Sequence, residues 1–194
     1  MGRPREFDRE LALEHATRVF WAKGFAATST EDLLQAMGIG RQSFYNAFGD
    51  KRTLYLEALE AYQANTLRGH LGRLHSPASP SAGIEDLLVG LIETDDGLRA
   101  LGCMGVGALC EFGGTDADVR ALAERGSARL HAGLQSRIRE GQEQGELAAR
   151  IDPSEAASFL QMTMMGIQLG ARGGADAGSL QAMARFSVDR LKSQ

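Results

Sequence analysis

The chain has 194 residues, of which 43% are hydrophobic and 24% are charged, and its formal net charge is −4. This balance is ordinary for a globular protein of one or two domains and excludes an intrinsically disordered chain. No apolar run approaches the ~18 residues that span a bilayer, and no apolar segment follows the charged start MGRPREFDRE. We therefore expect no membrane partner, no secretory signal and a cytoplasmic location.

The first three predicted elements are short helices, and no segment of the chain alternates as a half-buried strand would. Apolar residues at helical spacing form one face of the first helix, which ends at Gly24. Ser29 is a suitable cap for a second helix, which has an acidic first turn and stops at Gly38. The third helix, RQSFYNAF, ends at Gly49.

A long fourth helix begins at Lys51 and reaches about residue 75, where SPASPSAG is the clear loop. Beyond it, the apolar pattern predicts helices at about 83–95, 98–112, 116–144, 153–172 and 178–192. Asp152 and Pro153 mark the start of one of them, as an N-cap followed by a first helical residue. We expect an all-α fold, with an N-terminal domain at 1–53 and a C-terminal domain at 54–194.

Two short helices joined by the glycine turn MGIG have the arrangement of a helix-turn-helix. In that unit the second helix enters the major groove of DNA, with its N-terminal residues at the base edges. Phe44 and Phe48 are four residues apart, so both can anchor this helix while the polar residues around them face outward. Arginine can bond guanine, and glutamine or asparagine can bond adenine. The alternative is that the polar face of this helix is simply exposed to solvent and binds nothing.

Residues 12–59 read ALEHATRVFWAKGFAATSTEDLLQAMGIGRQSFYNAFGDKRTLYLEAL. This segment resembles the N-terminal DNA-binding domain of the TetR family of transcriptional regulators. The matching marks are Phe20, Gly24, Phe25, Thr28, Gly38, Ile39, Ser43, Phe44, Tyr45, Phe48, Lys51 and Leu54. The resemblance implies an all-α homodimer, usually a repressor, which a small ligand bound in the C-terminal domain releases from its operator.

The resemblance also implies particular contacts with double-stranded DNA. Carried over position by position, the DNA-binding residues are Thr30, Arg41, Gln42, Ser43, Tyr45, Asn46 and Lys51. An N-terminal arm is frequent in the family, and Arg3 and Arg5 could follow a minor groove or phosphates there. A solubilising tail is the alternative for the arm. The expected operator is a pseudo-palindrome, as a two-fold symmetric dimer requires.

The segment AASFLQMTMMGIQLGA, at 156–171, is apolar almost all round, so its helix can meet the core on one side and a second subunit on another. The family's dimers join the last two helices of each subunit in a four-helix bundle, and this sequence suits that arrangement. The dimer residues expected on these helices are Leu160, Ile167, Met183 and Phe186.

A ligand pocket among the helices of the C-terminal domain could use flexible methionines and a few polar groups. The candidate lining residues are Tyr62, Gln63, Thr66, Leu88, Met104, Cys110, Phe112, Met162 and Met165. Any one of these residues could instead be an ordinary member of the hydrophobic core. Apolar walls with sparse polar groups predict an uncharged or weakly polar effector.

Other functions must also be considered. Cys103 and Cys110 could instead make the same scaffold a thiol sensor of oxidants or electrophiles, unless they are inert. Seven residues apart on a continuous helix, they would lie ~10 Å apart, beyond the reach of a disulfide. An enzyme on an all-α scaffold is a further alternative, but no catalytic motif is visible. His70 and His75 point to different faces without nearby carboxylates, so we expect neither a metal site nor a cofactor.

Overall fold

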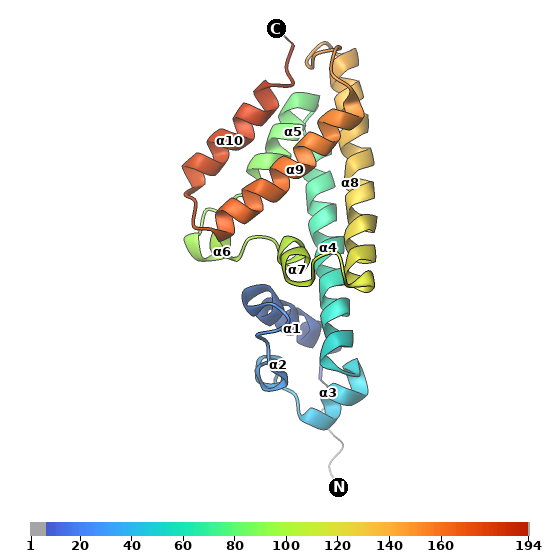
Figure 1. Ribbon diagram of the computed structural model, residues 1–194, viewed down its shortest axis with the longest axis vertical. Coiled ribbons are helices and arrows are strands. Elements are labelled where there is room, and N and C mark those ends of the chain that lie inside the picture. Colours follow the sequence, from blue (N-terminus) through green and yellow to red (C-terminus); the bar gives the residue numbers. More distant parts are fainter. Residues whose placement is uncertain (1–6, 194) are drawn as a thin grey trace.

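The computed structural model describes residues 7–193, and within them every regular element is a helix, as predicted (Figure 1). The predicted N-terminal arm with Arg3 and Arg5 lies outside the described residues. No helix of the described part is both long and apolar enough to cross a bilayer. The helices in chain order are α1 (Arg9–Lys23), α2 (Thr30–Met37), α3 (Arg41–Phe48), α4 (Lys51–His75), α5 (Pro80–Val89), α6 (Asp96–Leu101), α7 (Met104–Phe112), α8 (Ala117–Glu143), α9 (Pro153–Arg172) and α10 (Ala177–Asp189).

Local signals set the limits of the first helices. The side chain of Ser29 accepts the N–H of Asp32, and the carboxylate of Asp32 accepts the N–H of Ser29, so α2 begins with a reciprocal cap. Gly38 ends α2 in the left-handed region, at φ 65°, where a residue with a Cβ would be strained. This turn fixes the direction in which α3 leaves, and therefore the face that α3 presents.

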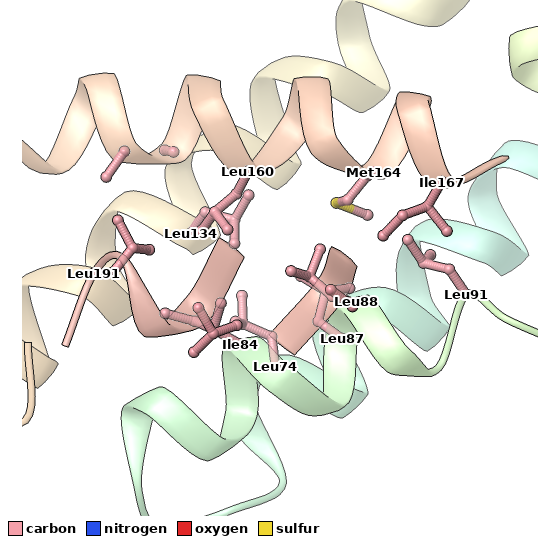
Figure 2. Packing of buried hydrophobic residues seen from close by; sticks show 14 of the residues in the cluster. Leu74, Ile84, Leu87, Leu88, Leu91, Leu134, Leu160, Met164, Ile167 and Leu191 are labelled. Carbon is pink, nitrogen blue, oxygen red and sulfur yellow. The ribbon is translucent and has the colours of Figure 1, made fainter. Parts of the chain in front are cut away.

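Two hydrophobic clusters hold the chain together, and α4 contributes to both. The N-terminal cluster packs α1, α2 and α3 against the first half of α4 and against α7, with Phe20 and Tyr55 almost wholly buried. The C-terminal cluster joins the second half of α4 to α5, α8, α9 and α10 (Figure 2). Because α4 runs unbroken between the clusters, it connects them mechanically (Figure 1).

The expected helix at 98–112 is divided in the structure into α6 and α7. Gly102 ends α6 at φ 60°, a conformation that favours glycine, and Cys103 is the N-cap of α7. A Cβ at Gly102 would also lie 2.9 Å from the backbone oxygen of Gln168, so α9 passes too close for any side chain. The break rotates α7 away from the path of α6, and this decides which residues of α7 reach a cavity.

Candidate functional site

Helix α3 is anchored by two buried phenylalanines and presents a polar face. Phe44 is 0% exposed and Phe48 is 2% exposed, so the aromatic pair packs into the N-terminal cluster as its spacing predicts. On the opposite face, the exposed residues include four of the predicted DNA contacts, which are Arg41, Gln42, Tyr45 and Asn46. Helix α3 lies at one end of the molecule, far from α9 and α10 (Figure 1).

The polar groups of α3 are held only by weak surface contacts. The guanidinium of Arg41 lies 3.2 Å from a carboxylate oxygen of Glu31, and both side chains are exposed. An exposed ion pair of this kind contributes only about 0–1 kcal/mol, so a phosphate or base can replace Glu31 at little cost. Nε2 of Gln42 donates to Oδ1 of Asn46 at 3.0 Å, which aligns the two amides on one face. These groups are therefore exposed, and their present contacts can be exchanged for others at little cost.

The other three predicted DNA contacts lie at the margins of this face. Thr30 at the start of α2 and Ser43 on α3 are half-buried. Lys51 is also half-buried, and its ammonium lies 4.3 Å from the centroid of the Phe25 ring. This cation–π contact steadies the lysine stem beside the α3–α4 turn while its charge stays near the surface.

A cavity of about 610 Å³ lies among α4, α7, α8 and α9. Five of the nine predicted pocket residues line it, and they come from α4 and α9: Tyr62, Gln63, Thr66, Met162 and Met165. The hydroxyl of Tyr62 lies beside the thiol of Cys103, and burial raises the pKa of this phenol, so it is un-ionised near neutral pH. The prediction that methionines of α9 and polar groups of α4 share a cavity agrees with this placement.

The other four predicted pocket residues do not line this cavity. Leu88 on α5 is wholly buried in the C-terminal cluster, since α5 packs behind α4 and α8. Met104 is buried in the N-terminal cluster, and Phe112 packs against the rings of Phe25 and Tyr55. Cys110 is exposed and borders a different cleft of about 370 Å³ beside α1. For the three positions on α7, the break at Gly102 is the reason, because it turns them toward α1 and the first half of α4.

Several polar lining residues were missed by the sequence prediction. They are His70 on α4, Cys103 at the start of α7, Arg120, Glu124 and His131 on α8, and Gln161 and Gln168 on α9. A signal for His70 was present, because Tyr62, Thr66 and His70 follow one another at four-residue spacing on one face of α4. The residues of α8 carried no such signal, since their spacing alone does not say which face of α8 meets α9.

Acid is expected to destabilise the fold through His70. Burial and the charge of Arg73 lower the pKa of His70 to about 4, whereas an unfolded histidine titrates at about 6.5. Between these values the unfolded chain binds a proton that the native chain excludes, so the free energy of unfolding falls as the pH falls. The expected loss is about 2 kcal/mol between about pH 7 and pH 4.5.

Urea unfolding of the unmodified chain and of His70→Gln at both pH values measures this loss. The variant should lose less stability on acidification, because its amide does not titrate. Asp116 does not affect this comparison. Its hydrogen bond with Arg52 lowers its pKa to about 2, below the pH range measured, and it is present in both chains. Equal losses in the two chains would show that His70 is not the source.

Six exposed apolar side chains on α9 and α10 together make up what we call the α9–α10 surface. Its exposed members are Phe159, Met162, Met165, Leu169, Met183 and Phe186. The predicted dimer residues Met183 and Phe186 belong to it, with 39% and 60% of their areas exposed. Leu160 and Ile167 do not, because both are 0% exposed and point into the subunit's own core (Figure 2). Their assignment to a dimer contact was wrong, since α9 turns this side toward α5.

Polar contacts connect the cavity wall to α1 and to the turn that joins α1 to α2. The carboxylate of Glu111 on α7 accepts the backbone N–H of Phe25 at 2.9 Å and that of Ala26 at 2.6 Å, in the turn that joins α1 to α2. Nε1 of Trp21 on α1 donates to the carbonyl oxygen of Gly102 at 2.9 Å, just before α7. A displacement of α7 would therefore move α1 and the turn before α2, or break these hydrogen bonds.

The two cysteines are free thiols, and both border the 370 Å³ cleft beside α1. Cys103 is half-buried at the N-cap of α7, Cys110 is exposed further along the helix, and both thiols are free. Within residues 7–193, no three His, Cys, Asp or Glu side chains gather as metal ligands.

Comparisons with known proteins agree with the arrangement of three short N-terminal helices followed by a larger helical part. A family model for bacterial regulatory proteins of the tetR family matches residues 12–58. A second, described as a tetracyclin repressor-like C-terminal domain, matches residues 91–186. YezE of Bacillus subtilis (strain 168), an uncharacterized HTH-type transcriptional regulator, is 33% identical over 98% of this chain and 100% of its own. ComR of Escherichia coli (strain K12), an HTH-type transcriptional repressor, is 27% identical over 94% of this chain and 88% of its own.

The fold comparison gives the same result. A cysteine mutant of the TetR family regulator CifR, complexed with 26-bp double-strand operator DNA, has a TM-score of 0.80 and 29% identity. That match covers 98% of this chain and 100% of the CifR chain. Reduced NemR of E. coli has a TM-score of 0.77 at 20% identity, which reflects the shared fold. The chain therefore belongs to the TetR family of DNA-binding transcriptional regulators, which are not enzymes.

Proposed function

We propose that the chain is a cytoplasmic, homodimeric repressor that binds a pseudo-palindromic operator through α3 and is released by a small, uncharged or weakly polar effector. The observation that carries the proposal is the polar face of α3, held outward by the buried pair Phe44 and Phe48. The effector site is the 610 Å³ cavity among α4, α7, α8 and α9. The family identification does not favour the thiol-sensor alternative.

The α9–α10 surface supports the dimer. If a two-fold axis passes through this surface, α9 and α10 of each copy would cover the exposed leucine, methionine and phenylalanine side chains of the other copy. The contact would then contain four helices. The same axis would relate two copies of α3, and a two-fold pair of reading helices requires two inverted half-sites in DNA. The pseudo-palindrome therefore follows from the dimer, and evidence against the dimer would also be evidence against the pseudo-palindrome.

Effector release is proposed to run through α7. Gly105, Val106 and Leu109 of this helix and its N-cap Cys103 line the cavity, and the helix holds the α1–α2 turn through Glu111. An effector that displaces α7 would therefore shift the turn that orients α2 and α3. The effector must bind the DNA-incompetent state more tightly than the competent one, since equal affinity for both would shift nothing.

Operator selection with the purified chain tests the function, and substitutions on α3 test the reading helix. Arg41→Ala or Asn46→Ala is expected to cost about 1–3 kcal/mol of operator binding and to relax the preference at one base pair. Lys51→Ala should weaken binding to all sequences alike and reduce the slope of affinity against salt by about 1. Fluorescence anisotropy over a salt series gives both quantities.

A matched control is Arg139→Ala, which removes an exposed arginine from the far part of α8 and should leave operator affinity unchanged. Unaltered affinity in a chain carrying both Arg41→Ala and Tyr45→Ala would show that α3 does not read the operator. Failure of the unmodified chain to select any sequence would contradict the proposed function as a whole.

A further inference from the structure

One polar pair in the cavity wall has no part in the mechanism above. His70 on α4 lines the 610 Å³ cavity, and it also lines a second cavity of about 710 Å³ that α1 borders. Arg73, one helical turn further on, lines only the second cavity. The imidazole thus stands in the wall between the two cavities, with the guanidinium on one side of it.

The contact between these side chains fixes the tautomer of His70. Arg73 donates from its terminal nitrogen to Nδ1 of His70 at 3.0 Å. A guanidinium is always protonated and has no acceptor, so Nδ1 must accept and cannot carry a proton. The neutral ring then carries its proton on Nε2. Burial and the neighbouring cation lower the pKa of His70 to about 4, so this neutral form prevails near pH 7.

The remaining ring nitrogen of His70, Nε2, is on the opposite side of the ring from the contact with Arg73. Because Arg73 lines only the second cavity while His70 lines both, we infer that Nε2–H is directed toward the 610 Å³ cavity. Among residues 7–193, no protein group forms a hydrogen bond with Nε2, and this atom is not among the buried polar atoms that lack a partner. The pair therefore holds one oriented donor toward the cavity.

The other polar groups of the lining give no preference for an ion, and Nε2 of His131 already contacts the carbonyl oxygen of Ser154 and the hydroxyl of Ser158. Its charged pair, Arg120 and Glu124, lies together on one exposed side of α8, with 3.7 Å between nitrogen and oxygen. The remaining polar groups on α4 and α9 are neutral: Tyr62, Gln63, Thr66, Gln161 and Gln168. Nε2 of Gln168 already donates to the carbonyl oxygen of Leu91 at 3.3 Å. A charged ligand would have to leave water without gaining an unpaired partner of opposite charge.

We propose that the effector is an uncharged, mostly apolar molecule with an exposed hydrogen-bond acceptor, such as a ketone, ester or ether oxygen, which accepts from Nε2–H of His70. Arg73 is the positioning residue that keeps His70 in the donating tautomer. A ligand of the same shape without the acceptor would leave the imidazole N–H unpaired when it displaces water, at a cost of about tenfold or more in affinity. This inference rests on the proposed function only in taking the cavity as the effector site.

The tautomer is tested first, by ¹⁵N NMR of the labelled full chain near pH 7. The sequence has four histidines, and the spectrum of His70→Gln assigns the resonances of His70 by their loss. The expected pattern is a protonated Nε2 and an unprotonated Nδ1. A protonated Nδ1, or a doubly protonated ring near pH 7, would overturn the proposal.

Ligand preference is tested with shape-matched probes of graded size. Each set contains an aryl or alkyl ketone, its counterpart with C=CH₂ in place of C=O, the corresponding carboxylate and the corresponding amine. Calorimetry on the unmodified chain should give dissociation constants at least about tenfold lower for ketones than for the matched alkenes. The preference should vanish in His70→Leu and return in His70→Gln, whose amide can donate.

The matched control is His75→Leu, because His75 lies exposed on the same helix. Equal binding of ketones and alkenes, a preference that survives His70→Leu, tighter binding of a carboxylate or amine, or no binding of any ketone would each overturn the proposal. Operator release is measured separately. A ketone that binds through His70 and leaves the operator complex intact would refute the proposed release mechanism while supporting this ligand class.

Discussion

Phe186→Glu is expected to turn the dimer into monomers and to lower operator affinity by at least about a hundredfold. The Phe186 ring is 60% exposed in the subunit, and we propose that the partner subunit covers it. By symmetry the substitution places two carboxylates in one contact, and each uncompensated buried charge costs about 3–5 kcal/mol. A monomer carries a single α3, so it loses one of the two half-site contacts.

Sedimentation velocity at micromolar concentration measures the assembly, and a footprint measures the operator. Leu169→Glu, at another exposed position of the α9–α10 surface, should have the same effect. Ser136→Glu adds the same charge at an exposed site on α8 and should leave the dimer intact. Ile167→Glu is a contrasting case, since it buries a charge in the subunit core and should unfold the chain. An unmodified chain that sediments as a folded monomer would contradict the dimer.

Glu111→Gln is expected to uncouple the effector cavity from the DNA-binding helices. Its carboxylate accepts two backbone N–H groups in the α1–α2 turn, and hydrogen bonds to a charged acceptor are among the stronger ones. Glutamine has one acceptor oxygen, so the turn keeps at most part of this attachment. For a compound that binds the cavity, the ratio of its affinities with and without operator should move toward one, by about 5- to 150-fold.

Two measurements check the uncoupling. Calorimetry with and without operator gives the ratio of affinities, and hydrogen exchange should become faster at the amides of Phe25 and Ala26. Glu143→Gln, an exposed glutamate at the end of α8, is the matched control and should change neither quantity. If Glu111→Gln speeds exchange but leaves the ratio unaltered, the attachment is structural and the signal takes another path, such as α4.

The sequence by itself determined the helical character of the chain, most of the helix limits and the face of α3. These features depend on interactions within about four residues. Ser29 and Asp32 cap α2, Gly38 ends it in a left-handed turn, and Phe44 and Phe48 fall on one side of a helix by period alone. A short stretch of sequence contains everything that such signals require, which is why the structure agrees with them.

The tertiary structure alone decided which apolar residues face a cavity, a core or a partner. Leu160 and Leu169 belong to the same apolar helix, yet one is wholly buried and the other is 55% exposed, because only one side of α9 faces the C-terminal cluster. Likewise, the break at Gly102 brings Cys103 to the cavity and turns Cys110 away from it. A leucine or cysteine has no local signal for its environment, since that environment consists of helices distant in sequence.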